Sequence, residues 1–451
     1  METIAGFDYF RLHYDGNGNL PAADEFSALS DAAAAATDVV FLAHGFRNDE
    51  NDATTLYTKF LTSLGGHLSR TEFQGVAARK ILFAAVYWPS KSYQETFPGD
   101  TGTVQDADIT AAQMEAVRQQ LQGLQVDATD AQKQALDQAI GLLPKLEHDT
   151  DAQDQFVSLV LSTIPADDDA GDAMEGLSLI RSQPGSELLN LLRRPVLMPA
   201  RRAAAGGGDS GGGVASVGEV VTSTGGGGVE GLGSTFGSIL GGAGKLGNMT
   251  TWYQMKSRSG VVGETGVVRA VRALKSDPLK VKVHLVGHSL GGRLMAACAR
   301  GLSQDPIVQP DSLTLLEAAF SHFGFSANNG LGMTGFFRDV IAKQVVKGPM
   351  LETFSAQDTV VGYVYAIVSR LASDNVRAIG DANDPFGGIG RNGAQKTKEA
   401  VFDQLHEPGN PYTFQTGVVT NLDGSGGLIT SHGDVTNDHV TYAFASALSA
   451  T

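Results

Sequence analysis

The sequence is short of cysteine and of positive charge, and each shortage excludes a class of protein. Cys298 is the one cysteine among 451 residues, so no disulfide can form within the chain. Its place in the apolar run 294–299 predicts a small buried core residue. Lysine and arginine number 33 against 49 aspartates and glutamates, which gives a formal net charge of -16. Such a chain repels phosphate backbones, and we expect no nucleic-acid partner.

Long apolar runs are also missing. Polar residues interrupt every apolar stretch well before the length of about 20 residues that a membrane-spanning helix needs. Residues 1–8 lack the basic and apolar segments of a secretory signal, so we expect a cytoplasmic protein, with export by a signal-independent route left open. The chain does contain ample core material, because 42% of its residues are hydrophobic and 18% are charged.

Short apolar runs alternate with helical patterns over much of the chain. The runs expected to form strands are residues 38–43, 81–88, 281–286, 313–316, 351–355 and 414–419. A helical pattern at 290–302 directly follows the third run. This alternation is typical of a mainly parallel sheet covered by helices on both faces, so the predicted fold class is α/β.

A large insertion is predicted between the second and third runs. Residues 89–280 separate them, far more than one crossover helix requires. We therefore predict a main domain of residues 1–97 and 248–451, with 98–247 inserted. The first part of the insertion has helical periodicity, whereas 206–247 contain 18 glycines in 42 residues. That composition favours neither helix nor strand and predicts a flap or linker, either an inert connector or a lid over the substrate.

Two segments fit the pattern Gly-x-Ser-x-Gly, and their contexts differ. Residues 208–212 fit it, but they lie in the glycine tract with no strand before them, so we interpret Ser210 as linker. Residues 287–291, Gly-His-Ser-Leu-Gly, stand between a predicted strand and a predicted helix. There Ser289 would occupy a sharp turn, and the flanking glycines would let strand and helix approach closely. The N–H of Leu290 would then face a developing oxyanion.

The second segment resembles the Gly-His-Ser-x-Gly-Gly nucleophile elbow of bacterial esterases and lipases in the α/β-hydrolase superfamily. His44-Gly45-Phe46, directly after the first run, is similar to the oxyanion loop of those enzymes. The resemblance covers about residues 36–92 and 250–451 and leaves the insertion unmatched. It implies the α/β-hydrolase fold, Ser289 as nucleophile, and the Phe46 N–H as the second oxyanion donor beside Leu290. For His44 and His288 we expect a role in ordering nearby backbone.

In this superfamily the acid and the base follow the serine, each at the tip of a late strand. Asp358, after the run 351–355, matches the acid, and Glu317, at the end of the preceding run, is its rival. His406, His432 and His439 lie beyond Asp358. His432 stands in a glycine-flanked loop before a helical pattern and is the predicted base, whereas His439 is expected to cap that helix or lie at the surface.

The predicted function is therefore hydrolysis of carboxylic esters through an acyl-enzyme on Ser289. The alternatives are an amide, thioester or peptide substrate, acyl transfer to an alcohol, and a non-catalytic binding protein built on a hydrolase scaffold. The expected substrate is a small-molecule or lipid ester, with transient contact to a lipid surface left open. No cofactor is expected and no metal, because paired cysteines of the kind that bind zinc are missing.

Overall fold

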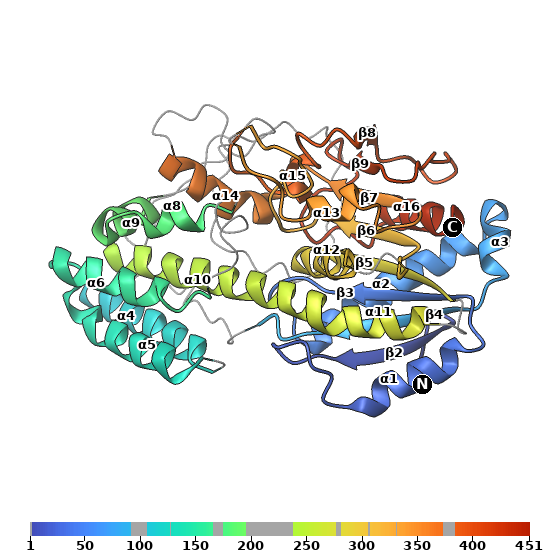
Figure 1. Ribbon diagram of the computed structural model, residues 1–451. Coiled ribbons are helices and arrows are strands. Elements are labelled where there is room, and N and C mark those ends of the chain that lie inside the picture. Colours follow the sequence, from blue (N-terminus) through green and yellow to red (C-terminus); the bar gives the residue numbers. More distant parts are fainter. Residues whose placement is uncertain are drawn as a thin grey trace.

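The apolar runs of the sequence form the centre of one sheet. The computed structural model describes residues 2–91, 106–126, 128–165, 175–194, 238–276, 281–304, 307–330, 332–372 and 384–451. Nine strands in these residues make a sheet of order β1-β2-β4-β3-β5-β6-β7-β9-β8 (Figure 1). They are β1 (Glu2–Ile4), β2 (Phe7–His13), β3 (Asp38–Ala43), β4 (Ile81–Tyr87), β5 (Lys282–His288), β6 (Ser312–Leu316), β7 (Met350–Phe354), β8 (Ala400–Gln404) and β9 (Val419–Asp423). Every neighbouring pair is parallel except β1 with β2.

Helices cover both faces of the sheet. One face packs against α1 (Ala23–Ala33), α10 (Ile239–Val261), α11 (Val268–Lys275) and α12 (Leu290–Leu302). The other face packs against α2 (Glu50–Leu68), the 3-10 turn η1 (Thr71–Phe73), α3 (Gln74–Ala77) and α16 (Asp438–Ser449). Within β3, Val39 and Phe41 point into the first core, whereas Val40 and Leu42 point into the second. A strand buried on both sides needs apolar residues at every position, which explains its unbroken apolar run.

The segment predicted to be inserted is largely helical in its described part, which lies at one end of the molecule, on the left in Figure 1. It contains α4 (Asp106–Leu124), α5 (Asp130–Leu142), the 3-10 turn η2 (Leu143–Lys145), α6 (Thr150–Leu161), α8 (Leu177–Arg181) and α9 (Gly185–Leu192). Three further helices connect the late strands: α13 (Arg338–Ala342), α14 (Thr359–Ala372) and α15 (Ile389–Asn392). A π-helical segment, η3 (Val262–Val267), joins α10 to α11.

Helix α10 corrects the prediction made from the glycine composition. It begins at Ile239, so residues 239–247 are helical, and it crosses the predicted domain boundary after residue 247. Close packing requires two of its glycines: a Cβ on Gly242 would lie 2.6 Å from the Leu189 carbonyl oxygen, and one on Gly247 would lie 2.5 Å from the Gln120 side chain. Glycine lowers the intrinsic stability of a helix, and here the close packing of α10 against its neighbours offsets that loss. The rest of the predicted flap, including Ser210, lies outside the described residues.

Five of the six predicted strands are confirmed as β3 to β7, with ends that differ by no more than about two residues. The sixth, 414–419, is wrong, because β9 begins only at Val419. Gly417 just before it has φ +76°, a left-handed conformation that interrupts an extended chain. The remaining strands, β1, β2, β8 and β9, were not predicted because they lie at or next to the edges of the sheet. Strand β8, for example, is mostly exposed and lacks a buried apolar run.

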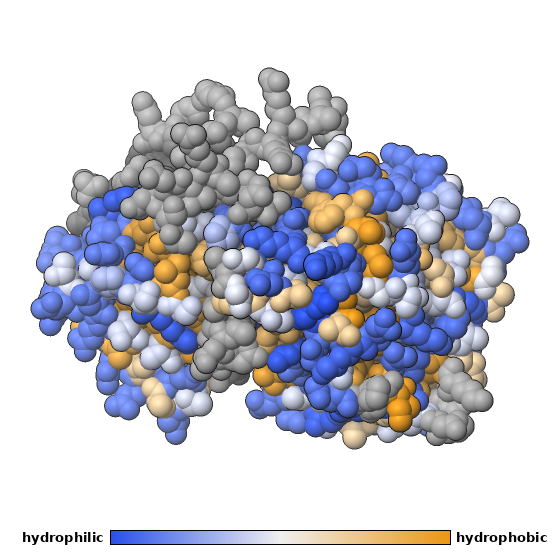
Figure 2. Space-filling model, turned by 45° about the horizontal axis from the view of Figure 1, so that its top comes forward, coloured by the Kyte–Doolittle hydropathy of each residue, from blue (hydrophilic) through white to orange (hydrophobic). Residues whose placement is uncertain are grey.

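The face shown in Figure 2 is mainly hydrophilic, and its hydrophobic patches are scattered between polar residues. None of the helices in the described ranges combines the length and apolar character needed to cross a bilayer.

Candidate active site

Ser289 lies in a sharp turn between β5 and α12, as predicted. Its φ of +58° is uncommon for a residue with a side chain, and such strain clusters at functional sites. A Cβ on Gly287 would lie 2.1 Å from the Gly291 carbonyl oxygen, and one on Gly291 would lie 2.3 Å from the Ala43 carbonyl oxygen. Both glycines are therefore required where strand and helix meet, which is the geometry of a nucleophile elbow.

His432 and Asp358 form a buried hydrogen-bonded pair. The distance from His432 Nδ1 to Asp358 Oδ2 is 2.8 Å, so the Nδ1–H donates to the carboxylate. The other Asp358 oxygen accepts from the Val361 N–H at 2.9 Å, near the start of α14. These two donors fix the orientation of the carboxyl group. With the ring proton on Nδ1, the Nε2 atom of His432 carries the lone pair of a neutral imidazole.

Glu317, the rival acid, is close to the same imidazole but is not bonded to it. Its Oε2 lies 3.9 Å from His432 Nδ1, beyond hydrogen-bond distance. The side chain is fully buried, and neither of its oxygens has a hydrogen-bond partner among the described residues. Burial first, and then the negative charges of Asp358, Asp434 and Glu352, raise the pKa of Glu317 well above its usual value. Among the described residues, Asp358 is therefore the carboxyl group that is hydrogen-bonded to His432.

This burial makes a testable difference to stability. The pKa of Glu317 is raised in the folded protein, so above about pH 4.5 the unfolded chain releases a proton that the folded chain keeps, and stability falls as pH rises. We expect Glu317→Gln, which resembles the protonated carboxyl, to raise the melting temperature at pH 8 and to change it little at pH 4. Thermal unfolding followed by circular dichroism at both pH values tests this, with exposed Glu187→Gln as the control. An equal shift at both pH values would contradict a role for ionisation.

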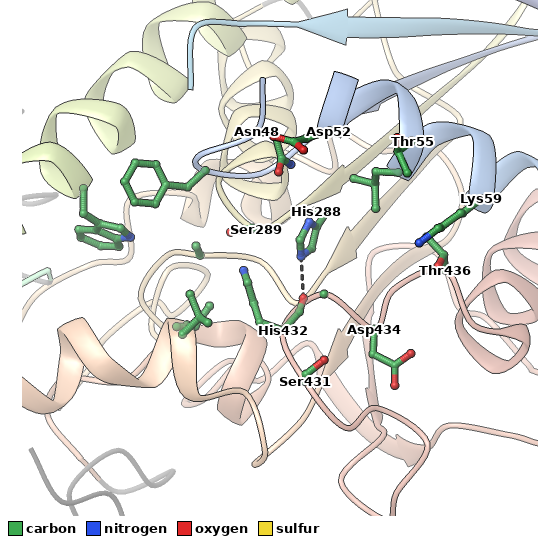
Figure 3. Close-up of a pocket in the computed structure, with 17 residues that line it drawn as sticks. Asn48, Asp52, Thr55, Lys59, His288, Ser289, Ser431, His432, Asp434 and Thr436 are labelled. Carbon is green, nitrogen blue, oxygen red and sulfur yellow. Dashed lines mark hydrogen bonds between the residues drawn. The ribbon is translucent and has the colours of Figure 1, made fainter. Parts of the chain in front are cut away.

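Ser289 and His432 line one pocket of about 220 Å³ (Figure 3). Among the described residues no hydrogen bond joins the Ser289 hydroxyl to the imidazole. Catalytic hydrogen bonds are often long without substrate and shorten when it binds. The missing hydrogen bond is therefore compatible with proton transfer from Ser289 to His432.

The loop of residues 44–46 packs directly against the elbow. A Cβ on Gly45 would lie 2.8 Å from Ser289 Cβ and 3.3 Å from its Oγ, so this position has no room for a side chain. Among the described residues, the backbone N–H groups of Phe46 and Leu290 have no hydrogen-bond partner. Both predicted oxyanion donors therefore lie close to Ser289: Leu290 follows it in the chain, and Phe46 belongs to the loop that packs against it. Neither N–H is used in a hydrogen bond among the described residues.

His44 and His288 order backbone, as the sequence predicted. His44 Nδ1 donates to the Gly45 carbonyl oxygen at 3.0 Å, and His288 Nε2 donates to the His432 carbonyl oxygen at 2.8 Å. Burial lowers the pKa of His44 to about 4 and that of His288 to about 3, so both rings are neutral at pH 7. One ring thereby holds the loop of residues 44–46, and the other holds the loop that carries His432.

His406 and His439 lie away from the pocket. His439 Nε2 is 2.9 Å from Glu407 Oε2 near the start of α16, a partly exposed pair consistent with the surface position expected for it. The ring of His406 stacks on Tyr412 with centroids 4.2 Å apart.

Two arrangements resemble metal sites. His284 and His288 have the His-x-x-x-His spacing, but they lie on strand β5, where four residues span about 13 Å, so the rings do not converge as on a helix. Donor atoms of Glu317, Asp358 and His432 lie within 4.8 Å of one another. There the direct hydrogen bond between His432 and Asp358 occupies the Nδ1 position that a cation would need.

Sequence reasoning missed the walls of the pocket. Trp252 of α10, Lys59 of α2 and Asp434 of the loop before α16 all line it. Their positions depend on how helices far apart in the sequence pack around Ser289, and no local pattern signals that packing.

Comparisons of this chain with protein-family models, with curated proteins and with solved structures give no match.

Proposed function

We propose that this protein is a serine hydrolase of the α/β-hydrolase fold that cleaves carboxylic esters. The observation that carries the proposal is the strained Ser289 turn and the His432–Asp358 pair in one pocket. The parallel sheet supports it, since Ser289 follows the central strand β5 and Asp358 follows β7. The chain order Ser, Asp, His is the order in that superfamily.

The geometry suits a two-step acyl transfer. In the first step Ser289 Oγ attacks the ester carbonyl carbon while His432 Nε2 accepts the hydroxyl proton. The N–H groups of Phe46 and Leu290 would stabilise the negative oxygen of the tetrahedral intermediate. His432 then returns the proton to the departing alcohol oxygen, which leaves an acyl-enzyme. In the second step water attacks this ester with the same histidine as base, releasing the carboxylic acid and free Ser289.

A fluorophosphonate probe tests the enzymatic part of the proposal. The probe forms a covalent bond with an activated serine, so we expect labelling of the native chain and its loss in Ser289→Ala. The matched control is Ser210→Ala, which removes the other serine with a Gly-x-Ser-x-Gly context and should leave labelling unchanged. Labelling that persists in Ser289→Ala would overturn the proposal. A panel of nitrophenyl esters and amides then separates ester from amide cleavage.

A further inference from the structure

Arg47 directly follows the loop of residues 44–46, and its backbone is strained. Its φ of +62° lies in the left-handed region, which is uncommon for a residue with a side chain. Such a conformation persists only where the surrounding structure holds it. The Arg47 N–H donates to the Ser90 carbonyl oxygen at 3.0 Å, which holds the backbone of this residue on one side.

The side chain of Arg47 is buried and contacts both Phe46 and α10. Its guanidinium lies over the Phe46 ring, 4.9 Å from the ring centroid. Its Nη2 donates to Asn248 Oδ1, on α10, at 3.2 Å. A guanidinium is attracted to the face of an aromatic ring, and a hydrogen bond from a charged donor is stronger than one between neutral groups. The side chain therefore ties the residue that carries the proposed oxyanion donor to α10.

Asn248 Oδ1 also accepts a hydrogen bond from the helical insertion. Gln120 of α4 donates from Nε2 to this oxygen at 2.7 Å and to the Gly244 carbonyl oxygen at 3.1 Å, and both amide side chains are buried. The partners fix which atoms are oxygen and nitrogen, because a carbonyl group only accepts and a guanidinium only donates. Gly247 makes room for the contact, since a Cβ there would lie 2.5 Å from the Gln120 side chain.

These contacts form one path from the insertion to the active site. It leads from α4 through α10, which runs between the helical end of the molecule and the sheet in Figure 1, to Arg47. The described lining of the pocket does not include Gln120, Asn248 or Arg47. Any effect of these side chains on the reaction therefore has to act through Phe46, which does line the pocket.

The place of the Phe46 N–H matters because an oxyanion donor acts only at short range. It has to lie about 2.7–3.1 Å from the oxygen that becomes negative, and a displacement of about 1 Å can cost about 10²-fold in rate. Without the Asn248 oxygen, Arg47 would lose one of the contacts that hold its left-handed backbone. Relaxation of that backbone would turn the adjacent peptide group of Phe46.

We propose that Gln120, Asn248 and Arg47 are positioning residues that fix the Phe46 oxyanion donor, and that the helical insertion is thereby required for the full catalytic rate. This inference rests on the proposed serine hydrolase function and gives the insertion a part in the same site. It assigns α4 and α10 a role that is separate from covering the substrate.

Variants at the shared acceptor test the proposal. Asn248→Leu removes the acceptor and keeps a side chain of similar size. We expect its kcat on a nitrophenyl ester to fall about 10-fold or more with little change in KM, because an oxyanion donor acts in the transition states of both acyl-transfer steps. Asn248→Asp keeps an acceptor oxygen for both donors and should retain most of the native kcat.

A second pair of variants tests the link to the insertion. Gln120→Met removes the donor on α4 and should lower kcat by a smaller factor than Asn248→Leu does, since Arg47 keeps its acceptor. The matched control is Gln119→Met, at the exposed neighbouring position of the same helix, which should leave kcat unchanged.

Counting active sites separates positioning from folding. Fluorophosphonate labelling carried to completion gives the number of competent sites, so kcat can be expressed per labelled site. Fewer labelled sites and a lower melting temperature, with unchanged kcat per site in Asn248→Leu, would indicate packing alone and overturn the inference. Equal losses in Asn248→Leu and Asn248→Asp, or equal kcat in Gln120→Met and Gln119→Met, would also overturn it. A native chain that neither labels nor hydrolyses any ester would overturn the serine hydrolase proposal as well.

Discussion

Ser289→Ala is expected to lower kcat on a nitrophenyl ester by about 10⁶ while the protein stays folded. The loss is large because the hydroxyl is the proposed nucleophile and no neighbouring group can replace its covalent bond to the acyl carbon. The fold should persist because alanine keeps the Cβ and adds no contact in the turn. Steady-state kinetics and the melting temperature measure the two effects separately.

His432→Ala is expected to cost about as much, because members of a triad act as a unit. His439→Ala is the matched control, since that histidine pairs with Glu407 rather than facing the pocket. An inactive His439→Ala beside an active His432→Ala would show that the base is assigned wrongly.

Asp358→Asn is expected to lower kcat by up to about 10⁴. The asparagine amide would donate to His432 Nδ1 instead of accepting from it. The proton of the neutral ring would then move to Nε2, which could no longer accept the Ser289 proton. The 2.8 Å distance between Nδ1 and Oδ2 is the reason to expect this effect at Asp358.

Glu317→Gln is the matched comparison for the acid, because Glu317 is equally buried and stands 3.9 Å from the same nitrogen. It should lose far less activity, since Glu317 makes no hydrogen bond to the imidazole. Kinetics of both variants above pH 7 decide between them. Full activity in Asp358→Asn, with a loss in Glu317→Gln, would assign the acid to the end of β6.

The central strands and the elbow could be predicted because their causes are local. A strand covered on both faces must be apolar throughout, and the turn at Ser289 needs glycine on both sides. Both requirements produce patterns that can be recognised in a few adjacent residues. The N-terminal part of α10 was predicted wrongly, because its glycines suggested a linker. In the structure Gly242 and Gly247 allow α9 and α4 to pack closely against α10.

The sequence by itself determined the α/β class, the position of Ser289 in a strand-to-helix turn, and a short list of acids and bases. Only the tertiary structure shows which of Asp358 and Glu317 is hydrogen-bonded to His432, since both follow neighbouring strands and their distances to Nδ1 are 2.8 Å and 3.9 Å. The walls of the pocket were likewise decided only there, because α2, α10 and the loop before α16 reach Ser289 from distant parts of the chain. Local backbone preferences act over a few residues, whereas the pairing of side chains across a site depends on how whole elements pack.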